Sequence, residues 1–218
     1  MWQFLRTLVS SSIGKKFIMA LTGLGAIGFL AVHLGGNLVL YLGPDSFNAY
    51  GRFLHSIPFL LVFEIGLLGV FAVHVVFAVI LTIGNWRSRP IAYSMRKTAG
   101  ASNVASSTMI YSGLVVLAFM TMHVLTITNT AAGLEEYDRV LFALSDPYGA
   151  ITYIFGVLAL GFHLFHGASS TVQSLGIRHP KYIGLISFVG QAATVILAGC
   201  FTSIPLYIWI VTSKGLVR

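Results

Sequence analysis

The feature that most limits how this chain can fold is a series of five apolar stretches separated by short connections. A helix needs about 20 apolar residues to cross the ~30 Å hydrocarbon core of a membrane. The predicted spans are residues 17–42, 57–84, 105–129, 148–176 and 183–212. Because backbone groups in lipid must be hydrogen-bonded within their own segment, we expect each span to be a helix. The prediction is an all-α, integral membrane bundle of five helices that forms one domain over residues 1–218.

The composition agrees with a surface that is covered by lipid. Hydrophobic residues make up 56% of the chain and charged residues only 9%, against about 25% charged residues in a soluble domain. The net charge of +7 comes from basic residues in the connections, which favours membrane topology over nucleic-acid binding. With one cysteine, Cys200, the chain is not expected to hold an iron–sulfur cluster, structural zinc or covalent haem.

The charges of the connections predict the orientation. Three connections that would lie on one side are basic, and they contain Arg6, Lys15, Lys16, Arg87, Arg89, Arg96, Lys97, Arg178 and Lys181. The connection between the third and fourth spans is acidic, with Glu135, Glu136, Asp138 and Asp146. The positive-inside rule therefore predicts a multi-pass protein with a cytoplasmic N-terminus. Lys214 and Arg218 at the C-terminus point weakly the other way.

Glycine and proline mark the ends of the spans. Gly43 and Pro44 are expected to end the first, Pro58 and Pro147 to lie in the first turns of the second and fourth, and Pro205 to kink the fifth. No internal repeat is evident at this level.

Five of the seven histidines lie inside predicted spans, and their default interpretation is functional. These five are His33, His74, His123, His163 and His166. His55 and His179 fall in connections and are expected to face water.

Helix direction gives the depth of two of these histidines. His74 follows Pro58 by sixteen residues, and His163 follows Pro147 by sixteen. Both helices start at the outer face, so both side chains lie ~24 Å inward at 1.5 Å per residue. We call His74 and His163 the inner pair.

The other two helices start from the cytoplasmic face. His33 follows Phe17 by sixteen residues, and His123 follows Ala105 by eighteen. Both side chains therefore lie ~24–27 Å from the inner end, in the outer half of the membrane. We call His33 and His123 the outer pair.

Two imidazoles at each depth match the axial ligands of a six-coordinate haem iron, whose chemistry is electron transfer. Zinc usually takes three or four protein ligands, and a proton relay in a membrane usually includes carboxylates, of which the spans contain only Glu64. Hydrogen bonding of each histidine to a neighbouring helix stays open as an alternative. His166 lies three residues after His163 and could replace it as ligand or contact a propionate.

Several motifs resemble the single-chain, dihaem cytochrome b anchor subunit of succinate:quinone oxidoreductases, the group that includes succinate dehydrogenases and fumarate reductases. The motifs are SSIGKK at 11–16, MALTG at 19–23, HLGGNL at 33–38, FHLFHG at 162–167 and QSLG at 173–176. The resemblance covers essentially the whole chain.

The resemblance implies two haem b groups, with a proximal haem on the inner pair and a distal haem on the outer pair. It implies a bacterial cytoplasmic (inner) membrane location and two partners on the cytoplasmic side, a flavoprotein with FAD and an iron–sulfur protein. The chain would exchange electrons with a quinone, expected to be menaquinone. A dimer of the whole complex is compatible with the sequence, which does not indicate the physiological direction.

Two details of the resemblance concern protons and quinone. Some dihaem relatives carry a glutamate two residues before the fourth-span ligand, where this chain has Gly161, so a transmembrane proton path of that kind is doubtful. Candidate quinone contacts near the distal haem are Glu64, Arg52 and Asn37. For Glu64, the alternative is an acid at a helix start that reaches the membrane interface.

Two other functions are compatible with membrane histidines. One is the haem b subunit of a formate dehydrogenase or hydrogenase, which the N-terminal motif and the basic cytoplasmic side disfavour. The other is a transporter that uses histidines for coupling ions. Such proteins often contain inverted repeats and broken helices, and neither is apparent here.

Overall fold

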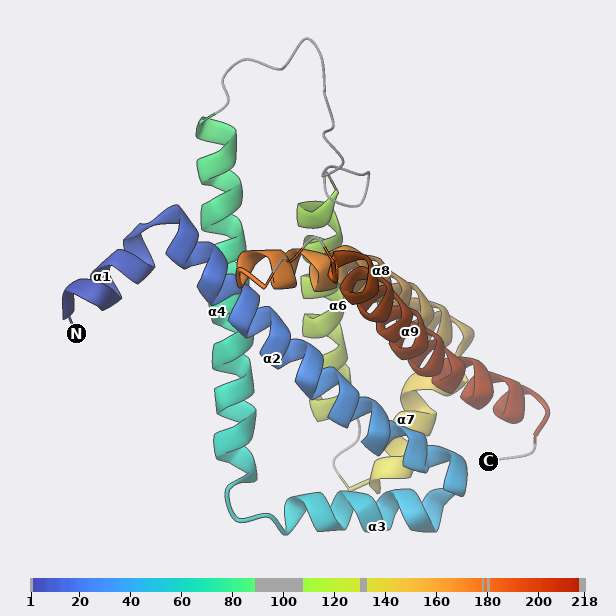
Figure 1. Cartoon of the computed structure of the whole chain (residues 1–218). Helices are drawn as coiled ribbons and strands as arrows, with labels where there is room; N and C mark the ends of the chain where they lie inside the picture. The colour runs from blue at the N-terminus through green and yellow to red at the C-terminus, as the bar shows by residue number, and fades with distance from the viewer. Residues whose placement is uncertain (1, 89–107, 130–132, 178, 180, 216–218) are drawn as a thin grey trace.

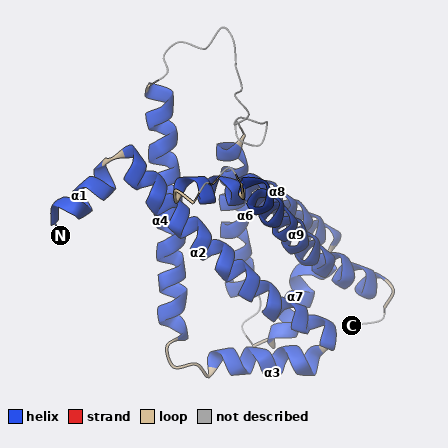
Figure 2. Cartoon of the chain, viewed as in Figure 1, coloured by secondary structure: helices blue, strands red, loops and turns tan. Residues whose placement is uncertain are grey.

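The computed structural model describes residues 2–88, 108–129, 133–177, 179 and 181–215 (Figure 1). Within these ranges the regular structure is entirely helical, without a strand (Figure 2). Five helices are long and apolar enough to cross a membrane. They are α2 (Ser12–Leu38), α4 (Leu60–Arg87), α6 (Met109–Asn129), α8 (Pro147–Ser174) and α9 (Ile183–Ser213). The predicted all-α bundle with five spans is confirmed.

The first span begins earlier than predicted. α1 (Trp2–Ser10) precedes it, and Ser11 separates the two helices and caps α2, since its Oγ accepts a hydrogen bond from the Gly14 N–H at 3.0 Å. A side-chain acceptor at this position satisfies a backbone donor that the helix leaves free. Lys15 and Lys16 therefore lie in α2 and not in a connection. At its other end α2 continues into the short 3-10 helix η1 (Val39–Leu42).

Two segments predicted as connections are helices. α3 (Pro44–His55) follows the first span, and α7 (Glu136–Ser145) follows the third. His55, predicted in a loop, is the last residue of α3, although its side chain is exposed as expected. Both helices are short and carry polar residues along one side, which gives them the sequence profile of a surface loop.

The proline positions agree only in part with the prediction. Pro147 is the first residue of α8, where Asp146 caps the helix by accepting hydrogen bonds from the Tyr148 and Gly149 N–H groups. Pro58 lies before α4, which begins at Leu60. Pro205 is inside α9 and buried. The predicted start of the third span at residue 105 lies outside the described residues.

Four of the spans form a ring. α2 contacts α4, α4 contacts α6, α6 contacts α8, and α8 contacts α2, while α9 packs along α8 (Figure 1). Across this ring, α2 faces α6 and α4 faces α8. α4 contains no fully buried residue, and much of its first half is exposed apolar surface, as a lipid-facing helix requires.

At one end of the bundle α3 and α7 pack on each other, and α7 also packs on α8 and α9 (Figure 1). Phe47 and Tyr137 join Leu40, Leu144 and Ile208 in the buried core there. The centre of this packing is polar. The buried Asn48 side chain accepts a hydrogen bond from the Tyr137 N–H at 2.9 Å and donates one to Glu135.

Asn48→Ala should destabilise the protein by about 1–3 kcal/mol, because it leaves the N–H of Tyr137 buried without its acceptor. The measurement is thermal unfolding in detergent, followed by circular dichroism. Asn85→Ala, at an exposed position on α4, is the matched control and should have little effect. Equal midpoints for the two variants would show that Asn48 does not hold α3 on α7.

Candidate functional site

The structure brings the outer pair together across the ring. His33 on α2 and His123 on α6 have ring centroids 6.0 Å apart, with their planes at 78°. Aromatic side chains surround both rings: Phe29 stacks on His33 at 5.1 Å, and Tyr153 meets His123 edge-on at 5.6 Å. The pair lies near the ends of α2 and α6 that lead to α3 and α7.

The inner pair comes from the other diagonal, α4 and α8. His74 lies on α4 and His163 on α8, the two helices that face each other across the ring. Each ring is held by the neighbouring helix, His74 by α2 and His163 by α6. The four histidines therefore form two pairs, and each pair uses one diagonal of the ring.

The contacts of His74 determine its tautomer. Its Nδ1 lies 3.1 Å from the backbone oxygen of Met19 and 3.4 Å from Thr22 Oγ1. A carbonyl oxygen can only accept, so Nδ1 carries the proton and Nε2 keeps its lone pair. Gly23 lies against the same ring, since a Cβ at that position would be 3.1 Å from His74 Cε1.

The contacts of His163 repeat this arrangement. Its Nδ1 lies 3.1 Å from Ser112 Oγ, with a further hydrogen bond to the backbone of Met109. A Cβ on Gly113 would be 3.3 Å from His163 Cε1. The ring again donates from Nδ1 and leaves Nε2 free.

The likeness of the two arrangements reveals an internal repeat that the sequence analysis missed. Four positions of α2 have counterparts 90 residues later in α6: Met19 and Met109, Thr22 and Ser112, Gly23 and Gly113, and His33 and His123. Pro58 and His74 are followed, 89 residues later, by Pro147 and His163. The units α2–α3–α4 and α6–α7–α8 thus have the same order of helices, and the expectation of no repeat is wrong.

The distance between the rings of the outer pair is the one that an iron between them would require. An imidazole nitrogen binds a transition metal at about 2 Å, so two imidazoles on opposite sides of one iron have ring centres roughly 6 Å apart. The observed 6.0 Å matches this arrangement. His123 Nδ1 is buried without a hydrogen-bond partner, an unusual state for a polar atom. Among the described residues no three His, Cys, Asp or Glu side chains cluster as a metal site, so the donor set has two imidazoles and no third ligand.

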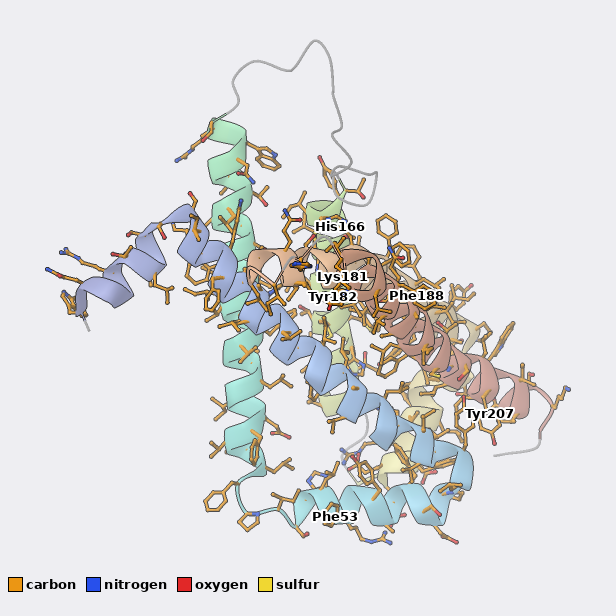
Figure 3. The ribbon with its side chains drawn as sticks, in the orientation of Figure 1. Phe53, His166, Lys181, Tyr182, Phe188 and Tyr207 are labelled. Carbon is orange, nitrogen blue, oxygen red and sulfur yellow. The ribbon has the colours of Figure 1, made fainter. Side chains whose placement is uncertain are left out.

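His166 does not belong to either pair. Its Nε2 lies 3.0 Å from Ser170 Oγ, one turn further along α8, and its side chain is partly exposed. Figure 3 shows His166 at the same end of the bundle as Lys181 and Tyr182, and at the opposite end from Phe53 and Tyr207. The contacts with α6 therefore favour His163 as the partner of His74.

The three quinone candidates have different surroundings. The Asn37 amide donates to the His33 backbone oxygen at 2.8 Å and lies 3.3 Å from His33 Nε2, so it belongs to the outer pair. Arg52 is exposed and forms an ion pair with Glu135 at 3.6 Å. Glu64 is exposed on α4. Of the three, only Asn37 contacts a paired histidine in the part of the chain that the structure describes.

Gly161 lies in an apolar contact between α8 and α9. A Cβ there would be 2.8 Å from the Cβ of Ala198. The small pocket at this position is lined by Leu30, Val157, Phe201 and other apolar side chains. This packing leaves no room for a glutamate.

Sequence reasoning also missed the residues that hold the inner pair. Thr22 and Ser112 look like ordinary small residues of apolar helices. Tyr153, which is 9% exposed beside His123 of the outer pair, looks like an ordinary aromatic residue of such a helix. The spacing of 90 residues is the signal that could have found Thr22 and Ser112.

Comparison with known proteins identifies one relative over most of the chain. The succinate dehydrogenase cytochrome b558 subunit of Bacillus subtilis (strain 168) is 30% identical over 186 residues, which cover 78% of this chain and 87% of the relative. No protein-family model matches, and no solved structure matches significantly. The five apolar helices, the paired histidines and this relative agree, and the chain belongs to the family of succinate dehydrogenase cytochrome b membrane subunits.

Proposed function

We propose that this chain anchors a succinate:quinone oxidoreductase in the membrane and carries electrons between its iron–sulfur subunit and a quinone. The observation that carries the proposal is the contact of His33 with His123 across the ring, together with the matching hydrogen bonds of His74 and His163 on the other diagonal. The named relative is a cytochrome b subunit of succinate dehydrogenase, which supports haem b as the group that these imidazoles bind.

In the proposed arrangement His74 and His163 hold the proximal haem and His33 and His123 the distal haem. A haem with two imidazole ligands supplies one-electron transfer and offers no open position for oxygen. On α2, residues 19–23 at the inner pair and His33 at the outer pair are ten to fourteen residues apart, which is about 15–21 Å along the helix axis. The two sites therefore form a path along the membrane normal.

The partners are expected on the side where α2 begins and α4 ends. The described basic residues at that side are exposed or partly exposed, and they are Arg6, Lys15, Lys16, Arg87 and Lys181. Arg89, Arg96, Lys97 and Arg178 lie outside the described residues. We propose that this is the cytoplasmic side and that it receives the iron–sulfur subunit, which in turn carries the flavoprotein with FAD.

We propose a quinone site beside the outer pair, with menaquinone as the substrate. Asn37 is the best-supported residue of the three, since its side chain is the one that lies at His33. Arg52 is engaged by Glu135, and Glu64 has no described contact with the outer pair, so both are weaker candidates.

The two alternative functions gain no support. The relative favours succinate dehydrogenase over a formate dehydrogenase or hydrogenase subunit. Repeats also occur in transporters, but their binding sites typically use broken helices, whereas α2, α4, α6 and α8 are unbroken at the histidines.

The pairing predicts which haem each histidine controls. His74→Ala and His163→Ala should each lose the same haem, and His33→Ala and His123→Ala the other, because each iron needs both imidazoles. The measurement is haem content per chain together with reduced-minus-oxidised spectra. His166→Ala and His179→Ala should keep both haems. Loss of the same haem in the His74 and His33 variants would contradict the diagonal pairs.

The orientation predicts opposite accessibility for two similar serines. Ser56 follows α3 and Ser88 follows α4, and each is exposed and hydrogen-bonded to a carbonyl of the preceding turn. In a Cys200→Ser background, a membrane-impermeant maleimide should label Ser56→Cys in intact spheroplasts and Ser88→Cys only after permeabilisation. The reverse pattern would show that the partners dock at the α3–α7 end.

A further inference from the structure

The two histidines of the inner pair are held by the same three-residue device. Each Nδ1 meets a methionine backbone oxygen and a hydroxyl three residues later, and a glycine follows the hydroxyl. The device consists of Met19, Thr22 and Gly23 for His74, and of Met109, Ser112 and Gly113 for His163. We propose that Thr22 and Ser112 are positioning residues that set the redox potential of the inner haem through these histidines. The inference rests on the proposed function.

The direction of the hydrogen bonds follows from the contacts of the hydroxyls. Ser112 Oγ donates to the Met109 backbone oxygen at 3.0 Å, so its single proton is already in use. Its oxygen therefore accepts from His163 Nδ1, 3.1 Å away. Thr22 Oγ1 donates to the backbone oxygens of Ile18 at 2.9 Å and Met19 at 3.1 Å, and it accepts from His74 Nδ1 at a longer 3.4 Å.

The glycines fix the position of each ring. Cβ atoms on Gly23 and Gly113 would lie 3.1 Å and 3.3 Å from the Cε1 atoms of His74 and His163. Helix and ring are therefore in contact along the edge that joins Nδ1 to Nε2. Each ring therefore meets α2 or α6 through its Nδ1 and Cε1 atoms, and the hydrogen bonds to these helices leave Nε2 unused.

The outer pair lacks this device. His123 Nδ1 is buried without a hydrogen-bond partner, and the polar neighbour of His33 is the Asn37 amide, at Nε2. The two pairs thus differ in the groups that form hydrogen bonds with the imidazole rings, although both pairs consist of histidines. Nothing in the family resemblance required that difference.

An acceptor at Nδ1–H makes an imidazole a stronger electron donor to its metal. Stronger donation favours the oxidised iron and lowers its reduction potential. Removing a hydroxyl should therefore raise the potential of the inner haem and leave the outer haem unchanged. Ser112 should have the larger effect, because its hydrogen bond is shorter than that of Thr22.

The experiment compares hydroxyl-free with hydroxyl-retaining variants in the assembled complex. Ser112→Ala and Thr22→Val remove the acceptor, and Ser112→Thr and Thr22→Ser exchange the two natural residues. The readouts are the midpoint potential of each haem by spectroscopic redox titration and the low-spin electron paramagnetic resonance signals. The inner haem is the one that His74→Ala removes.

We expect the midpoint potential of the inner haem to rise in Ser112→Ala and to rise less in Thr22→Val. In Ser112→Thr and Thr22→Ser it should stay near that of the unmodified protein. Identical titrations of the alanine and threonine variants at position 112, or a shift confined to the outer haem, would overturn the inference. If Ser112→Ala loses the inner haem, its retention in Ser112→Thr supports the role of the hydroxyl, and its loss in both contradicts it. Absence of haem from the unmodified protein would instead refute the proposed function.

Discussion

The structure depends on the interactions that the two ring nitrogens of each histidine make inside the membrane. A polar group that leaves water without a hydrogen-bond partner costs several kcal/mol, so an imidazole among lipid-facing helices needs an acceptor for its proton and a use for its lone pair. For the inner pair, helix backbone and hydroxyl oxygens accept the proton at Nδ1. Nε2 then remains as the free nitrogen on each ring, and a metal between the two rings would use both.

This arrangement of hydrogen bonds occurs twice because the chain contains the same unit of three helices twice. α2 and α6 each carry one histidine of the outer pair and the device that holds one histidine of the inner pair, fourteen residues or fewer apart. α4 and α8 each contribute an inner histidine. When the two units close into a ring, equivalent histidines necessarily face each other across it. The depth of each pair is therefore a consequence of helix direction, and α9 lies outside the repeat as a cover along α8.

The sequence predicted the five spans, because hydropathy acts over lengths much greater than the errors in helix ends. Helix direction also placed His33 and His123 in the same half of the membrane, and their rings lie 6.0 Å apart. It did not predict α3 and α7, because short helices at a membrane surface have mixed composition and lack a long apolar period. The repeat is weak in the sequence because few residues besides Met, Gly, Pro and His are shared, and a threonine in one unit corresponds to a serine in the other. Depth in the sequence favoured His163 over His166, and the contact of His163 with Ser112, which no spacing rule contains, favours it further.

The most direct test of the account is the number and coordination state of the haems in the purified protein. Haem extraction with protein quantification gives the ratio per chain, and carbon monoxide added to the reduced protein shows whether an axial position is open. The two diagonal pairs predict two haem b groups per chain, both low-spin and both unreactive toward carbon monoxide. One haem per chain, or a carbon monoxide complex at either site, would contradict two irons that are each held by a pair of imidazoles.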